Sequence, residues 1–138
     1  MTRIAFLGTP EAALPTLQAL AGRFDVPLVV TRPDRAGGRG RALSPPPVKS
    51  EAARLGIEVA QPESSQALER AIDSVRGLDL AVVVAFGRIL TPAALVVPQR
   101  GILNVHFSLL PRWRGAAPVA RAIMAGDTMS GVTIIRLD

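Results

Sequence analysis

The stretch LDLAVVVAF at residues 78–86 constrains the fold most, because after Asp79 it is continuously apolar and rich in valine. Such a run is typical of a strand covered on both faces, as in a parallel sheet, whereas a half-exposed strand alternates polar and apolar residues. We therefore expect this segment to lie at the centre of a sheet that has helices on both sides.

Shorter apolar segments alternate with segments of helical pattern along the rest of the chain. This alternation predicts an α/β fold with an open, mainly parallel twisted sheet and helices on both faces. The 138 residues, of which 49% are hydrophobic, are enough for one domain. Further strands are expected at 3–8, 25–31, 57–62, 101–106 and 131–138. Helices are expected at 10–22, 48–55, from a cap at Ser64 or Ser65 to about Val75, and at 117–126.

The composition excludes several kinds of site. The chain has no cysteine and one histidine, which rules out disulfides, thiolate nucleophiles and a zinc site built from several histidines. The lack of cysteine is consistent with a reducing cytoplasm, where we expect the protein to work. The longest apolar run, Leu80–Gly87, is far shorter than the roughly 20 residues of a membrane-spanning helix. We therefore expect a protein that binds no membrane. We also expect a monomer.

Positive charge is concentrated in one segment, RPDRAGGRGRALSPPPVK at 32–49, whose composition predicts a long loop. Its basic residues are Arg32, Arg35, Arg39, Arg41 and Lys49, against Asp34 as the only acidic residue. Arginine makes forked hydrogen bonds that suit phosphate groups. The segment is therefore either a phosphate-binding loop or an ordinary solvated surface loop.

Open α/β sheets bind ligands in the crevice beyond the carboxyl ends of their strands. Three segments follow the expected strands at that edge: Gly8–Glu11, Phe86–Leu90, and the chain from Asn104 onward. The first of these turns, GTPEAA, holds one glycine, so it lacks the G-x-G-x-x-G pattern of dinucleotide-binding proteins. A nicotinamide dinucleotide site is therefore not expected.

Asn104 and His106 are two residues apart, so on a strand their side chains share one face. An amide donor beside an imidazole suits the stabilisation of an oxyanion together with proton transfer, as acyl transfer requires. The alternative is a histidine that only satisfies a structural hydrogen bond, and the spacing alone leaves both interpretations open.

Longer blocks of sequence carry a family resemblance. NVHFSLLPRWRGAAPVARAIMAGD, with GVTIIRLD after it, resembles the folate-dependent formyltransferases, and among them those that act on methionyl-tRNA. IAFLGTPEAALPTL, PDRAGGRGRALSPPPVK and VVVAFGRIL match the same family in the same order. The resemblance covers essentially the whole chain.

The resemblance implies 10-formyltetrahydrofolate as formyl donor, the amino group of initiator methionyl-tRNA as acceptor, and no metal. It implies that Asn104 bonds the formyl oxygen and that His106 stabilises the tetrahedral intermediate and assists proton movement. The implied folate-binding residues are Ser108, Leu109, Leu110 and Pro111, with Arg88, Ile89 and Leu90 along the pterin pocket. The implied tRNA-binding residues are Arg39, supported by Arg35, Arg41 and Lys49.

The chain departs from the family pattern at two places. The family's catalytic aspartate follows the strand that matches GVTIIRLD, and Asp138 matches an earlier acidic residue. Ala12 stands where many relatives have phenylalanine. The resemblance therefore implies that residues 1–138 are the amino-terminal part of a formyltransferase catalytic domain, without a carboxy-terminal barrel domain and with weak or no activity. A sugar-nucleotide amine formyltransferase, a glycinamide ribonucleotide enzyme and a non-catalytic RNA-binding remnant remain alternatives.

Overall fold

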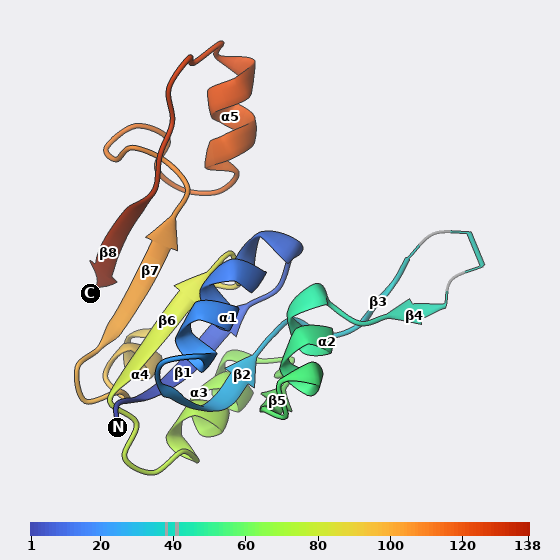
Figure 1. Cartoon of the computed structure of the whole chain (residues 1–138), viewed down its shortest axis with the longest axis vertical. Helices are drawn as coiled ribbons and strands as arrows, with labels where there is room; N and C mark the ends of the chain where they lie inside the picture. Colours follow the sequence, from blue (N-terminus) through green and yellow to red (C-terminus); the bar gives the residue numbers. More distant parts are fainter. Residues whose placement is uncertain (38, 41) are drawn as a thin grey trace.

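The computed structural model describes residues 1–37, 39–40 and 42–138, and its main feature is a six-stranded sheet (Figure 1). The strand order is β5-β2-β1-β6-β7-β8. The strands are β1 Arg3–Gly8, β2 Asp25–Val30, β5 Glu58–Ala60, β6 Leu80–Val84, β7 Ile102–His106 and β8 Thr133–Leu137. Neighbouring strands are parallel except for β8, which runs antiparallel to β7. The predicted open, mainly parallel sheet is thus confirmed, with the apolar run of residues 78–86 forming β6 near its centre.

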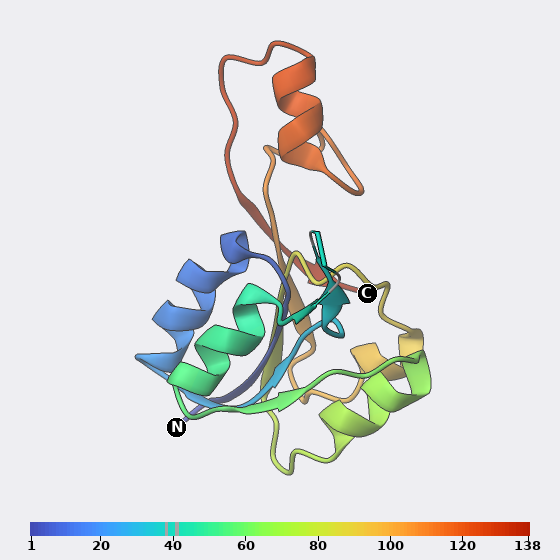
Figure 2. The same cartoon turned by 90° about the vertical axis from the view of Figure 1, so that its right-hand side faces the viewer.

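Helices cover both faces of this sheet (Figure 2). The chain forms the 3₁₀ helix η1 Glu11–Ala13 and the α-helices α1 Leu14–Ala21, α2 Pro47–Arg54, α3 Ser65–Asp73, α4 Pro92–Leu95 and α5 Pro118–Met124. The helices α1 and α2 lie on one face, and α3 and α4 lie on the other. The architecture is therefore a three-layer arrangement of helices, sheet and helices.

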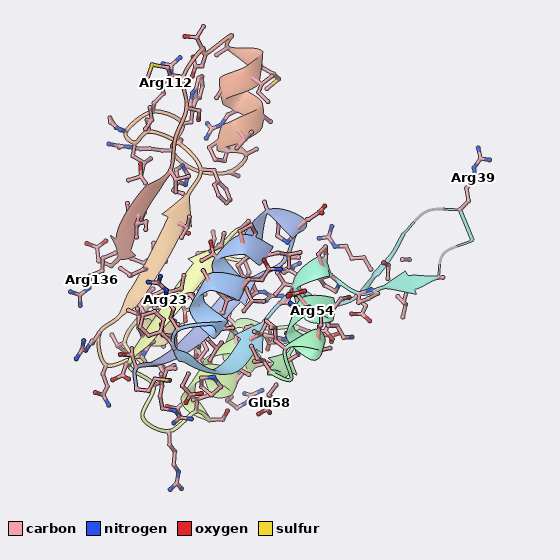
Figure 3. All side chains as sticks on the ribbon, in the orientation of Figure 1. Arg23, Arg39, Arg54, Glu58, Arg112 and Arg136 are labelled. Carbon is pink, nitrogen blue, oxygen red and sulfur yellow. The ribbon has the colours of Figure 1, made fainter. Side chains whose placement is uncertain are left out.

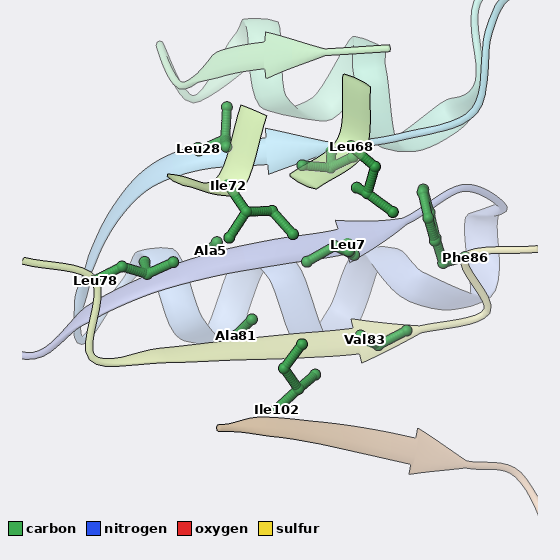
Figure 4. Close-up of a cluster of buried hydrophobic side chains, with 11 residues drawn as sticks. Ala5, Leu7, Leu28, Leu68, Ile72, Leu78, Ala81, Val83, Phe86 and Ile102 are labelled. Carbon is green, nitrogen blue, oxygen red and sulfur yellow. The ribbon is translucent and has the colours of Figure 1, made fainter. Parts of the chain in front are cut away.

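Strand β1 shows why the sheet needs covering on both sides. Its residues Ile4 and Phe6 belong to the cluster that packs with α1 and α2, whereas Ala5 and Leu7 belong to the cluster that packs with α3. Figure 4 shows the second cluster, with Ala5 and Leu7 beside the α3 residue Ile72. All five of these side chains are at most 2% exposed. Successive side chains of a strand point to opposite faces, so a continuously apolar strand is stable only between two layers.

Three local features differ from or refine the sequence-based expectations. The segment expected to be a loop contains an antiparallel hairpin of β3 Arg35–Ala36 and β4 Leu43–Ser44. The short helix α4 was not expected, although Thr91 caps it by accepting the Ala94 N–H at 3.2 Å and Pro92 opens it. Of the two candidate caps for α3, Ser64 is the one used, since its Oγ accepts the Ala67 N–H at 3.1 Å.

The helix α5 and the loops around it extend beyond the carboxyl end of the sheet (Figures 1 and 2). Several of its apolar side chains are exposed, among them Val119, Ile123 and Met124. Within the described part of the chain, no helix has the length and apolar character needed to cross a bilayer.

Gly8, the last residue of β1, permits a close approach between elements at the carboxyl edge. A Cβ at this position would lie 2.8 Å from the Val84 carbonyl oxygen on β6 and 3.0 Å from the Ala13 Cβ in η1. Neither contact can relax easily, because one atom is backbone and the other is attached directly to it. A larger residue would therefore push β1 away from β6 where the functional site begins.

Candidate functional site

A cavity of about 1200 Å³ opens at the carboxyl edge of the sheet. It brings together two of the three expected segments, the turn after β6 and the chain from Asn104 onward, and the start of α5 closes another side. Its walls are mostly apolar, and Asp138 also lines it. This volume exceeds the roughly 300–1000 Å³ typical of small-molecule pockets, so the cavity has room for a large ligand or for two reacting groups.

Asn104 and His106 both line this cavity from β7 and both are half-buried. Their neighbours on β8 are Ile135 and Thr133, respectively. The His106 Nε2 lies 2.8 Å from the backbone carbonyl oxygen of Trp113. Because a carbonyl can only accept, Nε2 must carry the hydrogen, and in the neutral ring Nδ1 is then the nitrogen that can accept a proton. The histidine thus makes a structural hydrogen bond and keeps one basic nitrogen for a ligand.

The chain after His106 is fixed by side-chain hydrogen bonds. Ser108 is fully buried, and its Oγ donates to the Arg112 carbonyl at 2.7 Å. Thr133 Oγ1 donates to the Ser108 carbonyl at 2.7 Å and accepts the Leu110 N–H at 3.2 Å. The segment that ends at Trp113 is therefore tied both to itself and to β8.

Trp113 is held by a carboxylate that follows α5. Its indole Nε1 donates to Asp127 Oδ2 at 2.7 Å, and Arg112 donates to both Asp127 oxygens at 2.8 and 2.6 Å. The Arg112 and Arg121 guanidinium groups also lie 4.5 and 5.7 Å from the centre of the indole ring, within range of cation–π attraction. Figure 3 shows Arg112 beside α5. None of these contacts was predicted from the sequence.

The ion pair with Arg112, followed by the indole hydrogen bond, lowers the pKa of Asp127 from 3.8 to about 2. A carboxyl group whose pKa is lower in the folded protein than in the unfolded chain stabilises the fold at pH values above its pKa in the unfolded chain. That contribution is therefore complete above about pH 4 and is lost as the pH falls through about 2. The Asp127 contacts thus persist at neutral pH.

Five of the seven residues expected to bind folate line the cavity. They are Arg88, Ile89, Leu90, Leu110 and Pro111. The other two lie outside its lining: Ser108 is buried, and Leu109 packs towards Gly131, where a Cβ would come within 2.5 Å of it. The Nε of Arg88 is buried and has no hydrogen-bond partner among the described residues.

Among the residues that the structure describes, three that are not glycine adopt a left-handed backbone, and each of them lines this cavity or bonds a residue that does. Ala85 and Ala117 line it, with φ values of 48° and 53°, and Trp113, with φ 59°, supplies the carbonyl for His106. Such backbones cost about 1–3 kcal/mol each and concentrate at functional sites. Their clustering supports a functional assignment for the cavity independently of its polar residues.

A second cavity of about 490 Å³ adjoins the first through shared residues after β6. It includes the remaining expected segment, with Thr9 and Glu11, and the base of the hairpin, with Arg32 and Arg35. Thr9 Oγ1 donates to the Phe86 carbonyl at 2.9 Å and so joins the ends of β1 and β6. The three segments expected at the carboxyl edge thus surround two adjoining cavities.

The expected tRNA-binding residues occupy different environments. Arg35 is exposed on β3, and Arg39 is exposed at the end of the hairpin, where it points away from the protein (Figure 3). Arg41 lies outside the described residues. The Lys49 Nζ is 3.0 Å from both carboxylate oxygens of Asp34, so its charge is paired. Hydrogen bonds from Gln61 and then Lys49 lower the pKa of Asp34, which keeps this pair ionised at neutral pH.

The fold and the cavity define a class: an open α/β protein with a large cavity at the carboxyl edge of its sheet, lined by an amide and an imidazole from one strand. Comparison with known proteins is more specific, since the family model described as formyl transferase matches residues 2–138. The chain belongs to the formyl transferase family.

Individual relatives agree with this assignment. Methionyl-tRNA formyltransferases from Xanthomonas euvesicatoria and Xylella fastidiosa are 54% and 51% identical over 138 residues, covering 99% of this chain and 45% of theirs. The chain therefore spans about half the length of these curated relatives. Among solved structures, a glycinamide ribonucleotide transformylase from Geobacillus kaustophilus is 26% identical with a TM-score of 0.76, over 100% of this chain and 75% of that one. A phosphoribosylglycinamide formyltransferase from Streptococcus pneumoniae is also 26% identical, with a TM-score of 0.77 and coverage of 100% and 74%.

Proposed function

We propose that the protein transfers a formyl group from 10-formyltetrahydrofolate to the amino group of initiator methionyl-tRNA, as part of translation initiation in the cytoplasm. The observation that carries this proposal is the Asn104 and His106 pair on the wall of a large apolar cavity, in a chain 54% identical to a methionyl-tRNA formyltransferase. Residues 1–138 would be the amino-terminal part of the catalytic domain, with the carboxy-terminal barrel domain outside this sequence.

In the proposed reaction the amino nitrogen of methionine attacks the formyl carbon, and negative charge develops on the formyl oxygen. The Asn104 amide would donate a hydrogen bond to that oxygen, which stabilises the tetrahedral intermediate. The bond between the formyl carbon and N10 of the folate then breaks, while one proton leaves the attacking amine and N10 gains one. His106 would assist this proton movement through Nδ1, because its Nε2 already donates to Trp113.

The folate would occupy the apolar part of the cavity. Leu90, Leu110 and Pro111 supply apolar surface for a flat pterin ring, as does Ile89, which is 90% exposed. Arg88 lines the same wall, and its unpartnered Nε needs an acceptor, since a buried donor without one is costly. Polar atoms on a pterin or its glutamate tail would satisfy this donor.

The tRNA would lie along the arginine-bearing hairpin β3–β4. Exposed arginines contribute to binding by neutralising phosphates, which gives affinity without sequence discrimination. Arg39 and Arg35 are free to make such contacts in the described structure, whereas Lys49 is engaged by Asp34. We therefore assign the direct contacts to the arginines, leave Arg41 as a candidate, and give Lys49 the role of fixing the hairpin's base.

A second candidate is transfer to glycinamide ribonucleotide, which the names of the matching solved structures favour. A small phosphorylated acceptor of this kind, or an amino-sugar nucleotide, would not need the projecting hairpin. This alternative therefore predicts a different acceptor with the same folate site.

The acceptor is tested by titrating the 138-residue chain with methionyl-tRNA, glycinamide ribonucleotide and an amino-sugar nucleotide at several salt concentrations. The proposal predicts saturable tRNA binding that weakens steeply with salt. Binding of either small acceptor in preference to tRNA would contradict it, and tRNA binding without any folate binding would indicate a non-catalytic RNA-binding remnant. Formylation of methionyl-tRNA is measured in parallel, with weak turnover expected.

A further inference from the structure

The orientation of His106 depends on a carbonyl in an unusual backbone conformation. The only hydrogen bond found for its imidazole in the described structure joins Nε2 to the Trp113 carbonyl at 2.8 Å. Trp113 has φ 59°, a left-handed conformation that is unfavourable for a non-glycine residue. Something must therefore hold this peptide in place for His106 to keep its partner.

The side chain of Asp127 is placed to do this. It accepts three hydrogen bonds, one from the Trp113 indole at 2.7 Å and two from Arg112 at 2.8 and 2.6 Å. The two donors are consecutive residues, so one carboxylate fixes the side chains on both sides of the Arg112–Trp113 peptide, next to the peptide that carries the Trp113 carbonyl. Asp127 is itself anchored, because its backbone N–H donates to the Ala122 carbonyl of α5 at 3.0 Å. Its side chain is 14% exposed, which limits competition from water.

A carboxylate suits this position because it offers only acceptors to three donors. An asparagine would supply one acceptor oxygen and turn an NH₂ group towards at least one N–H. Arg121 adds a positive charge 5.7 Å from the indole centre, and its guanidinium donates to the Arg114 carbonyl. Arg112 and Arg121 thus place positive charge beside the indole, and Asp127 places a negative charge there.

We propose that Asp127 is a positioning residue for His106, acting through the Trp113 indole and the left-handed Trp113 peptide. It connects the end of α5 to the functional cavity without lining that cavity itself. The inference rests on the proposed function only in giving His106 a chemical role, whereas the mechanical link from Asp127 to His106 stands on the contacts alone.

The link is measured by NMR on the 138-residue chain, in which His106 is the only histidine and Trp113 the only tryptophan. Labelling with ¹⁵N-histidine gives a single imidazole, and the exchange rate of its Nε2–H proton with water reports the Trp113 hydrogen bond. The wild type is expected to show a protected Nε2–H proton. Asp127→Asn is expected to speed its exchange by about tenfold, the effect of losing a charge-assisted contact.

Two further variants separate this link from general damage to the fold. Asp25→Asn is the matched control, since it removes a carboxylate from an ion pair with Arg3 at 3.0 Å on another part of the sheet, and it should leave the exchange unchanged. Trp113→Phe removes the indole N–H but keeps the carbonyl, and it should speed exchange as Asp127→Asn does. If Asp127 acts through the indole, adding Asp127→Asn to Trp113→Phe should cause little further change.

Unchanged exchange in a folded Asp127→Asn protein would overturn the proposal, as would an unprotected Nε2–H proton in the wild type or fully additive effects in the double variant. If Asp127→Asn does not fold, Trp113→Phe decides: faster exchange supports the link, and unchanged exchange refutes it. The measurement needs neither folate nor tRNA. Its failure would therefore leave the proposed formyl transfer intact, and absence of formyl transfer would leave this link intact.

Discussion

At the scale of single residues, some residues at the cavity adopt backbone conformations that are rare for residues other than glycine. Ala117 has φ 53° where α5 begins, and Ala85 has φ 48° just after β6. Both positions turn the chain around the cavity, so their strain is maintained by the packing of the elements on either side. The cost of this strain can be measured by substitution.

Ala117→Gly should stabilise the protein by about 0.5–1 kcal/mol. Glycine removes the left-handed strain of roughly 1–2 kcal/mol, and the greater entropy of glycine in the unfolded chain offsets part of the gain. The matched control is Ala19→Gly, at an exposed position within α1, which should destabilise by about 1 kcal/mol. Urea unfolding measures both changes, and destabilisation by Ala117→Gly as large as that by Ala19→Gly would contradict the strained conformation.

Sequence spacing predicts the positions of Asn104 and His106 in the cavity, because the two-residue period of a strand decides which side chains share a face. It does not predict the contact between Asp127 and Trp113. That contact depends on the path of two loops and on where α5 ends, and no local pattern encodes either. The same limit applies to Ser108, whose burial follows from the folding of its loop around the Arg112 carbonyl.

At the scale of elements, a single side chain defines the start of α3. Ser64→Ala should destabilise the protein by about 1 kcal/mol, because the Ala67 N–H loses its acceptor. Ser65→Ala, one residue later and inside the helix, should change stability by less than about 0.5 kcal/mol. Thermal or urea unfolding of the two variants decides between them, and equal losses would mean that Ser64 is not the cap.

The hairpin β3–β4 is the element proposed to contact tRNA. Arg39→Ala should weaken tRNA binding and reduce the slope of log affinity against log salt by about 1, since one phosphate contact is lost. Arg23→Ala, which removes another exposed arginine just after α1, is the control and should leave both quantities unchanged. Equal effects of the two substitutions would show that tRNA binds through diffuse charge instead of through the hairpin.

The sequence predicts those elements whose apolar patterns face a core, and so β1, β2 and β6 and the helices α1, α2 and α3 are close to their expected ranges. It does not predict the hairpin, because both of its two-residue strands are exposed and carry no apolar alternation. The direction of β8 is also beyond a local pattern, since antiparallel pairing with β7 is set by the route of the chain through α5.

At the scale of the whole molecule, two separate apolar layers hold the functional edge of the sheet in place. Phe6 is fully buried in the layer beneath α1 and α2, and it lies two residues before Gly8 at the carboxyl edge. Loss of this side chain would loosen β1 against its neighbours. The sheet and the site therefore depend on the same core.

Phe6→Ala should lower the free energy of unfolding by about 3–5 kcal/mol. This is a large part of the roughly 5–15 kcal/mol by which a typical domain is stable. The control Phe24→Ala removes the same atoms from a side chain that is 38% exposed, and it should cost less than half as much. Urea unfolding monitored by circular dichroism measures both. Similar losses for the two variants would contradict the described core.

We propose that Asn104 donates a hydrogen bond to the formyl oxygen of a folate held in the cavity. The most direct test compares binding of 10-formyltetrahydrofolate and tetrahydrofolate to the wild type and to Asn104→Leu, which keeps the side chain's size but removes its amide. Fluorescence of Trp113, the chain's single tryptophan, reports binding. Asn104→Leu is expected to lower the affinity for 10-formyltetrahydrofolate by about fivefold to tenfold, which corresponds to the loss of one hydrogen bond. The affinity for tetrahydrofolate should not change. Equal weakening of both ligands, or no folate binding by the wild type, would contradict the claim.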